Sequence, residues 1–235
     1  MMENFKIDEV YGMHNWPGVE LGKFAIRSGP FFAASDFIEA TISGKGGHAA
    51  KPHETIDPTV IASQIVVALQ TIASRRVDPV EQVVVSITSF ETSSTAFNVI
   101  PQEVKIKGTV RTLDPDVRDL AEKEFLRITE LTAEAMGGSA DAKFTRGYPV
   151  MSNSSEQTEF AAKVARDVAG ECAEAPLVMG GEDFAYMLEE RPGAYILLGN
   201  GDSSPVHHPK YNFNDDAIPF GCSWLVELVE QKMPA

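Results

Sequence analysis

The chain has 235 residues, 43% of them hydrophobic, and carries 20 Lys and Arg against 34 Asp and Glu, a formal net charge of −14. This composition is typical of a globular protein, and the acidic excess argues against binding to nucleic acids or anionic membranes. We find no apolar run long enough to span a membrane, no signal peptide in MMENFKIDEV and only two cysteines, so we expect a cytoplasmic protein without a disulfide scaffold.

Six elements are predicted in the middle of the chain, in the order strand, helix, strand, strand, helix, strand. Ile38, Ala40 and Ile42 alternate with polar residues, which is typical of a half-buried strand. Asp57-Pro58 and Asp114-Pro115 each place an N-cap residue before a proline, which predicts a helix start at both positions. The six elements are expected at 36–43, 58–75, 82–90, 103–112, 115–137 and about 139–146.

The side chains of this segment separate into an inner and an outer face. In the strand 103–112, Val104, Ile106 and Val110 are predicted to point inward, and Arg111 lies on the opposite face. The second helix is expected to be lined by apolar residues at helical spacing. These residues are Val117, Leu120, Phe125, Ile128, Leu131 and Ala135.

The order of these elements predicts four antiparallel strands with two helices on one face. This arrangement leaves one sheet face and an edge strand uncovered, and pairing with a second copy is one way to cover them. The flanks predict a strand at 9–14, a helix at 156–169, a strand at 195–199 and a helix at 217–232. We therefore expect an α/β protein in which an inserted domain, 30–148, separates the segments 1–29 and 149–235 of a second domain.

All five histidines, His14, His48, His53, His207 and His208, fall in predicted loops beside glycine, proline or asparagine. Catalytic and ligand residues favour such loops, and neutral imidazole is a common metal ligand and general acid or base. An ordinary hydrogen-bonded or exposed histidine remains the alternative at each position. Spacing alone does not define a metal site, because neither HExxH nor a CxxC pair is present.

Four other polar residues have both a structural and a functional interpretation. Glu182 and Asp183 follow two glycines, where they either complement a helix start or bring a carboxylate into a cleft. Arg111 is either a solvated strand residue or a guanidinium that binds a substrate carboxylate. Asn98 is either a turn residue or an amide donor to a developing oxyanion.

Five motifs together carry a resemblance to a known family. In chain order they are MHNWPG, GKGGHAAKPHETIDP, FNVIPQEVKIKGTVRT, GGEDFAYM and VHHPKYNFND. The chain resembles the zinc amidohydrolases, carboxypeptidase-like metallopeptidases that include aminoacylases and hippurate hydrolases. The resemblance implies an αβα catalytic domain that holds a pair of divalent metals, zinc or manganese, with an inserted ferredoxin-like βαββαβ lid and dimerisation domain.

The resemblance also implies roles for five residues. His14 of MHNWPG and His207 of VHHP would be metal ligands. His48 of GGHAA would reach from one subunit's lid into the active site of its partner in a homodimer and, with Asn98, stabilise the tetrahedral oxyanion. Arg111 of GTVRT would hold the carboxylate of the amino-acid half of the substrate.

The remaining histidines and two absent motifs limit this assignment. His208 occupies a position that varies in the family, and His53 is expected to structure its loop. Family members carry a CGHDGH-like motif and a Glu-Glu pair before MHNWPG, which supply the other metal ligands and the water-activating glutamate, and this sequence has neither. It therefore resembles the C-terminal two-thirds of such an enzyme.

The predicted function is metal-dependent hydrolysis of the amide bond of an N-acyl amino acid, a small-molecule substrate similar to hippurate. Two alternatives remain at this stage. One is a catalytically inactive lid and dimerisation fragment, and the other is a dipeptidase or desuccinylase of the same family.

Overall fold

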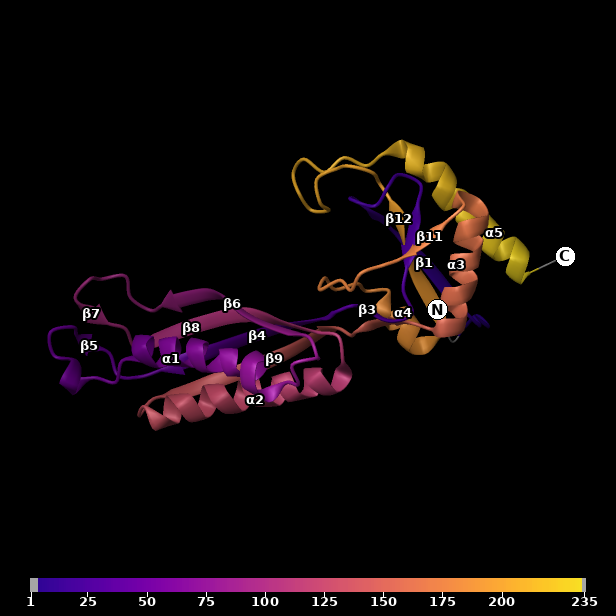
Figure 1. Cartoon of the computed structure of the whole chain (residues 1–235). Helices are drawn as coiled ribbons and strands as arrows, with labels where there is room; N and C mark the ends of the chain where they lie inside the picture. The colour runs from indigo at the N-terminus through magenta and orange to yellow at the C-terminus, as the bar shows by residue number, and fades with distance from the viewer. Residues whose placement is uncertain (1–3, 234–235) are drawn as a thin grey trace. The chain divides into compact units, whose positions relative to one another are not determined.

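The computed structural model describes residues 4–233, which divide into two compact units (Figure 1). Unit 1 contains the residues up to Phe32, Met151–Val178 and the residues from Glu182 onward. Unit 2 contains Ala33–Val150 and Met179–Gly181, whereas the inserted domain was predicted at 30–148. Within residues 4–233, no helix combines the length and the apolar character needed to cross a bilayer.

Unit 2 is built on a four-stranded antiparallel sheet with the strand order β6-β8-β4-β9. The six predicted elements occur in the predicted order. The helix predicted to end near residue 75 changes to π-helical hydrogen bonding after Thr71. The elements are β4 (Ala34–Ser43), α1 (Pro58–Thr71), the π-helical η2 (Ile72–Arg76), β6 (Val83–Thr92), β8 (Glu103–Thr112), α2 (Pro115–Ala135) and β9 (Ser139–Tyr148).

Both helices of unit 2 begin as their sequence signals predict. The Asp57 side chain accepts a hydrogen bond from the Thr59 amide at 2.8 Å. The Asp114 side chain accepts from the amides of Asp116 and Val117 at 2.8 and 3.0 Å. Each cap satisfies amide groups that have no partner inside the helix, so the two predicted helix starts are confirmed.

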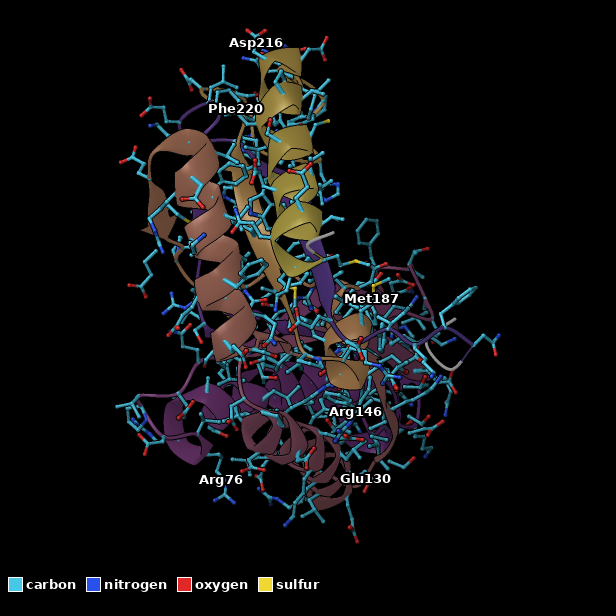
Figure 2. The ribbon with its side chains drawn as sticks, turned by 90° about the vertical axis from the view of Figure 1, so that its right-hand side faces the viewer. Arg76, Glu130, Arg146, Met187, Asp216 and Phe220 are labelled. Carbon is cyan, nitrogen blue, oxygen red and sulfur yellow. The ribbon has the colours of Figure 1, made fainter. Side chains whose placement is uncertain are left out.

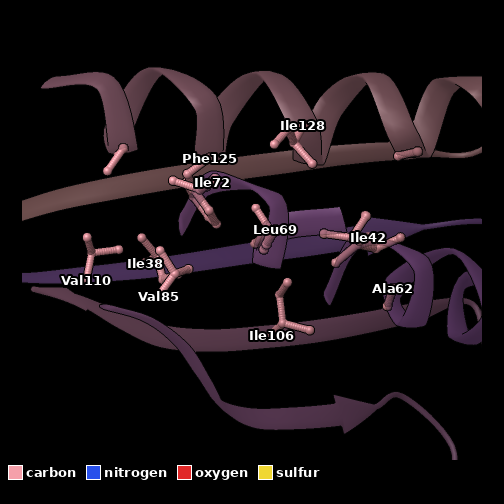
Figure 3. Close-up of a cluster of buried hydrophobic side chains, with 14 of the residues drawn as sticks. Ile38, Ile42, Ala62, Leu69, Ile72, Val85, Ile106, Val110, Phe125 and Ile128 are labelled. Carbon is pink, nitrogen blue, oxygen red and sulfur yellow. The ribbon is translucent and has the colours of Figure 1, made fainter. Parts of the chain in front are cut away.

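The core of unit 2 lies between its two helices and one face of the sheet (Figure 3). Ile38, Ala40 and Ile42 are buried there, as their alternation predicts. The prediction for the end of α2 was wrong, because Leu131 and Ala135 are exposed and Ala133 is buried in their place. At about 100° per residue, Leu131 lies about 120° around the helix from the buried Phe125, whereas Ala133 lies only about 80° from it on the other side.

A buried ion pair fastens β4 to α2 in unit 2. Asp36 is 0% exposed, and its carboxylate accepts two hydrogen bonds from the Arg118 guanidinium, at 2.9 and 2.6 Å. It also accepts from the Gly147 amide at 3.0 Å, and Arg118 donates to the Gly147 carbonyl at 3.2 Å. One bidentate pair therefore connects β4, α2 and the end of β9.

A second buried carboxylate lies on α2. Glu124 is 2% exposed and is paired with Arg127 at 2.6 Å and with Arg76 of η2 at 3.1 Å. Hydrogen bonds from Arg127, and then from Arg76, hold the pKa of Glu124 below its ordinary value of 4.5, although burial opposes this shift. The ion pairs connect α2 with the segment in which α1 changes its hydrogen-bonding pattern.

We expect Glu124→Gln to lower the free energy of unfolding by about 1–3 kcal/mol at neutral pH and to flatten its dependence on pH. Because its pKa is lowered in the native state, Glu124 binds fewer protons there than in the unfolded state near pH 4. The stability that the Glu124 carboxylate contributes is therefore present above about pH 5 and is lost as the pH falls further. Urea unfolding of the variant and of the unaltered chain between about pH 3 and pH 7 measures this difference in the free energy of unfolding. Glu130→Gln, an exposed change on the same helix, is the control, and an equal flattening in both variants would contradict the assignment.

Unit 1 contains a mixed four-stranded sheet with the order β1-β12-β2-β11. β1 runs parallel to β12, β12 antiparallel to β2, and β2 parallel to β11. β1 and β12 were predicted from the sequence, whereas the two three-residue strands were not. The bounds are β1 (Val10–Trp16), β2 (Phe24–Ile26), β11 (Cys172–Glu174) and β12 (Gly193–Gly199).

The two faces of this sheet are covered differently. Helices α3 (Ser155–Ala169) and α5 (Ile218–Lys232) lie side by side over one face (Figure 2), where Trp224 and Phe24 are fully buried. The other face packs against α4 (Ala185–Glu190) and a two-stranded ribbon, around Phe31, Phe32 and Tyr195. The ribbon consists of β3 (Gly29–Phe32) and β10 (Met151–Asn153).

Candidate active site

The five predicted site residues fall into two groups, one in each unit. His14 and His207 belong to unit 1, and His48, Asn98 and Arg111 belong to unit 2. The geometry of each group shows which side-chain atoms are available for chemistry.

His14 lies near the carboxyl end of β1, the end of a parallel strand at which α/β sheets commonly place ligands. Its Nδ1 lies 2.6 Å from the carbonyl oxygen of Asn15. A carbonyl oxygen can only accept, so Nδ1 is the protonated nitrogen and the neutral ring keeps its lone pair on Nε2. The ring also packs edge-on against Trp16, with 5.6 Å between the ring centroids. In the neutral ring, this contact leaves Nε2 with a free lone pair, which can accept a hydrogen bond or bind a cation.

His207 lies in the loop 200–214, which connects β12 to the 3-10 helix η3 (Asp215–Ala217). Its φ is 67°, the only positive φ at a non-glycine position among residues 4–233. A histidine in this left-handed region costs of the order of 1–3 kcal/mol, and such strain is concentrated at functional sites. The neighbouring His208 instead accepts the Lys210 amide through Nδ1 at 3.1 Å, which ties its ring to the turn.

His48 and Asn98 come together at one tip of unit 2. His48 belongs to β5 (Gly47–His48), which pairs with β7 (Val99–Ile100), and the Ala49 amide donates to the Asn98 carbonyl at 2.9 Å. The Nδ1 atom of His48 accepts the Ala50 amide at 3.1 Å. In the neutral ring the proton is consequently on Nε2, so the exposed edge of His48 is a hydrogen-bond donor.

Arg111 is half-buried on β8, on the sheet face that the alternation predicts. Its Nη1 donates to the Val110 carbonyl at 3.1 Å and to the Thr109 hydroxyl, which in turn donates to the Asp36 backbone carbonyl at 2.9 Å. Burial lowers the pKa of Arg111, and the nearby Asp36 carboxylate opposes this shift. No ion pair of Arg111 is found within the described part of the chain, so its guanidinium is suited to binding an anion.

Glu182 has a structural role within unit 1. One carboxylate oxygen accepts the Phe184 amide at 3.2 Å, and the other accepts the Tyr195 hydroxyl at 2.8 Å. Burial, with a further contribution from the Glu182 carboxylate, raises the pKa of Tyr195, which keeps this phenol protonated as a donor. Glu182 therefore connects the GGEDF segment to β12, which supports the structural interpretation of this motif.

The remaining sulfur and nitrogen groups add no ligand cluster. Burial raises the pKa of the Cys172 thiol to about 11, which disfavours the thiolate. His53 is an exposed residue of the 3-10 helix η1 (Pro52–Glu54). Within residues 4–233, no group of three or more His, Cys, Asp or Glu side chains is arranged to hold a metal ion. The described residues therefore contain isolated imidazoles and no complete metal site.

Three polar residues beside the two candidate ligands were not predicted from the sequence. Asn15 follows His14, and Tyr211 follows His207 within VHHPKYNFND. Asn200 ends the segment YILLGN and is 2% exposed. The asparagines of MHNWPG and KYNFND were the available signal, but which asparagines bond to each other depends on contacts across the fold.

Comparison with known proteins identifies the class of protein. The chain matches peptidase family M20/M25/M40 over residues 1–231, and it belongs to this family. It is 38% identical to the N-acetyl-L-cysteine deacetylase of Bacillus subtilis over 225 residues, which cover 96% of this chain and 54% of that protein. It is 36% identical to the hippurate hydrolase of Campylobacter jejuni over 234 residues, which cover 97% of this chain and 60% of that protein.

A solved structure gives the same result for the fold. A dinuclear metal-binding peptidase of the M20 family from Bacillus subtilis superimposes with a TM-score of 0.81 at 29% identity, and the match covers 97% of this chain and 58% of that one. The mixed α/β fold of the described residues is thus the fold of this family. The chain spans little more than half the length of the relatives it matches.

Proposed function

We propose that this chain contributes to a metal-dependent amidohydrolase that cleaves the amide bond of an N-acyl amino acid. The observation that carries the proposal is the complementary protonation of two histidines. His14 presents an Nε2 lone pair, as a metal ligand requires, and His48 presents an Nε2 proton, as an oxyanion donor requires. The relatives named as an N-acetyl-L-cysteine deacetylase and a hippurate hydrolase support this class of substrate.

The roles of the chain's own residues follow from their geometry. His14 and His207 would each donate one nitrogen to a divalent metal, zinc or manganese. When bound, such a metal lowers the pKa of a coordinated water and polarises the amide carbonyl. His48 and Asn98 would donate hydrogen bonds to the oxygen that becomes negative as the carbonyl is attacked. The Arg111 guanidinium would bind the carboxylate of the amino-acid half and fix its orientation.

Unit 2 would serve as a ferredoxin-like lid and dimerisation domain. Its edge strand β6 is bonded only to β8 in the described chain, and it exposes Val84 and Phe90. Helix α1, which contacts β6, exposes Val60 and Val67. An unpaired edge flanked by exposed apolar side chains favours pairing with a second copy, so a homodimer through unit 2 is the arrangement we propose.

The other metal ligands must come from outside the described residues, and unit 1 has a surface suited to their arrival. β1 lies at the edge of its sheet, is bonded only to β12 in the described chain, and is half-buried along all of its 7 residues. A strand added parallel to β1 would end beside His14, because the carboxyl ends of parallel strands meet at one edge of a sheet.

Helix α5 extends this open surface. Its buried face carries Trp224 and Leu228, whereas a second apolar face, spaced by three or four residues, is exposed. Lys232 lies between the two faces and pairs with Glu9, just before β1, at 2.8 Å. The second face is therefore on the β1 side of the helix. Its members are Ile218, Cys222, Leu225, Val226, Val229 and Met233.

A chimera tests the proposed function. The part of the Bacillus subtilis N-acetyl-L-cysteine deacetylase that precedes its match to this chain would be fused before Met1. With added zinc or manganese, we expect the chimera to release amino acid from N-acetylcysteine or hippurate, and the 235-residue chain alone to show negligible turnover, because its described residues provide no complete metal site.

Three outcomes of this experiment are decisive. Loss of activity in the chimera on His14→Ala would support the role of His14. Robust activity of the chain alone, or a folded chimera that stays inactive, would contradict the proposal. Hydrolysis confined to dipeptides or N-succinyl substrates would assign the chain to a dipeptidase or desuccinylase.

A further inference from the structure

The loop 200–214, which carries His207, is held by hydrogen bonds between polar side chains. It contains no helix or strand, and a cavity of about 250 Å³ in it is lined by polar residues such as Asp202, Ser203 and Lys210. With polar side chains around this cavity, apolar packing contributes little to holding the loop in place. The strained backbone of His207 nevertheless requires its surroundings to be well fixed.

Asn200 is the buried centre of these contacts. Its Nδ2 donates to the Asn212 carbonyl at 2.9 Å, and its Oδ1 accepts the Asn214 amide at 2.8 Å. The same oxygen accepts the Asn15 side-chain amide at 3.0 Å, and the Asn200 backbone amide donates to Trp16 at 3.1 Å. A buried amide is costly unless it is hydrogen-bonded, and this one, at the start of the loop, is bonded to the end of the loop and to the end of β1.

Asn15 completes the connection between the two candidate ligands. It directly follows His14, and its Oδ1 accepts the Tyr211 hydroxyl at 2.5 Å while its Nδ2 donates to Asn200. Both ends of one side chain are therefore used, one toward the end of β12 and the other toward the far side of the His207 loop. Neighbours in such a network fix each other's orientation.

We infer that Asn15, Asn200 and Tyr211 are positioning residues that fix the His207 loop against the end of β1 before any metal binds. Their effect on metal binding rests on the proposed function, whereas their effect on the loop does not. A ligand held in place by its neighbours loses less conformational entropy on binding, and such outer contacts typically change metal affinity by about 10- to 100-fold.

Tyr211→Phe tests the inference, because it removes one hydroxyl and leaves the ring. Tyr11→Phe is the matched control, since the Tyr11 hydroxyl donates to Glu9 at 2.7 Å at the opposite end of the same strand. We expect both variants to remain folded, with similarly small losses of stability. Only Tyr211→Phe should accelerate amide hydrogen exchange in residues 203–214, by about tenfold.

Zinc titration followed on the histidine ring nitrogens by NMR is the second readout. In Tyr211→Phe we expect the zinc concentration needed to shift the His207 signals to rise by about tenfold, and in Tyr11→Phe to stay unchanged. Asn15→Leu, which removes both bonds of the central side chain at similar size, should have the larger effect on both readouts.

The two readouts separate this inference from the proposed function. If zinc shifts the ring-nitrogen signals of neither His14 nor His207, in the unaltered chain or in the chimera, the proposed metal role fails. The hydrogen-exchange data alone then decide whether the three residues position the loop. Loop exchange that is unchanged in Tyr211→Phe, or equally faster in Tyr11→Phe, would overturn the inference.

Discussion

Asp36→Ala should be the most destabilising single substitution that we predict, with an expected loss of about 3–5 kcal/mol in the free energy of unfolding of unit 2. The substitution leaves the Arg118 guanidinium, 8% exposed, without its carboxylate. It also removes the acceptor of the Gly147 amide. Removing one partner of a buried ion pair costs far more than the pair itself contributes, because the remaining charge is still desolvated.

Chemical denaturation measures this loss, and two further variants make the test specific. Asp119→Ala breaks an exposed pair with Arg146, and should cost less than about 1 kcal/mol. The double variant Asp36→Leu with Arg118→Met removes both charges, so it should recover a large part of the stability. A double variant less stable than Asp36→Ala would show that the uncompensated charge is not the cause.

His48→Ala in the active chimera should lower kcat by about 100- to 1000-fold, or roughly 3–4 kcal/mol of transition-state stabilisation. KM should change little, because in the proposed role the Nε2 proton of His48 would meet a negative charge that exists only in the transition state. Arg111→Ala should instead raise KM strongly, since a substrate carboxylate is already charged in the ground state. His53→Ala, which alters an exposed histidine of the neighbouring η1, is the control.

Mixing inactive subunits tests where His48 acts. If it reaches the active site of a partner subunit, chimeras carrying His48→Ala and chimeras carrying His14→Ala should regain some activity as heterodimers. One of the two sites would then have both an intact metal ligand and an intact oxyanion donor. Subunits that demonstrably exchange but remain inactive would contradict the cross-subunit role and leave His48 as a loop residue.

Local sequence signals were sufficient for the parts of the fold that depend on neighbouring residues. The alternation around Ile38, Ala40 and Ile42 predicts a strand with one buried face, and Asp57 and Asp114 predict two helix starts, because pleat and cap geometry act over a few residues. The same holds for the order of the elements in unit 2. Leu131 shows the limit, because only the helix register against the sheet decides which apolar residue is buried.

The three-residue strands depend on contacts that are distant in sequence. β2, β10 and β11 are too short to show a period, and each is stabilised by pairing with segments far along the chain. The buried pair of Asp36 and Arg118 is equally invisible in the sequence, because either residue alone is an ordinary surface charge.

For the candidate site, the sequence by itself determined the residue types: five histidines beside glycine, proline or asparagine, an arginine on the outer face of a strand, and the motifs of a family. The folded backbone decided their chemical state, although each hydrogen-bond partner lies only one or two residues from its histidine. The Asn15 carbonyl makes Nδ1 of His14 a donor, and the Ala50 amide makes Nδ1 of His48 an acceptor. The physical reason is that a neutral imidazole has one proton for two nitrogens, and its hydrogen-bond partners, which folding supplies, determine which nitrogen carries it.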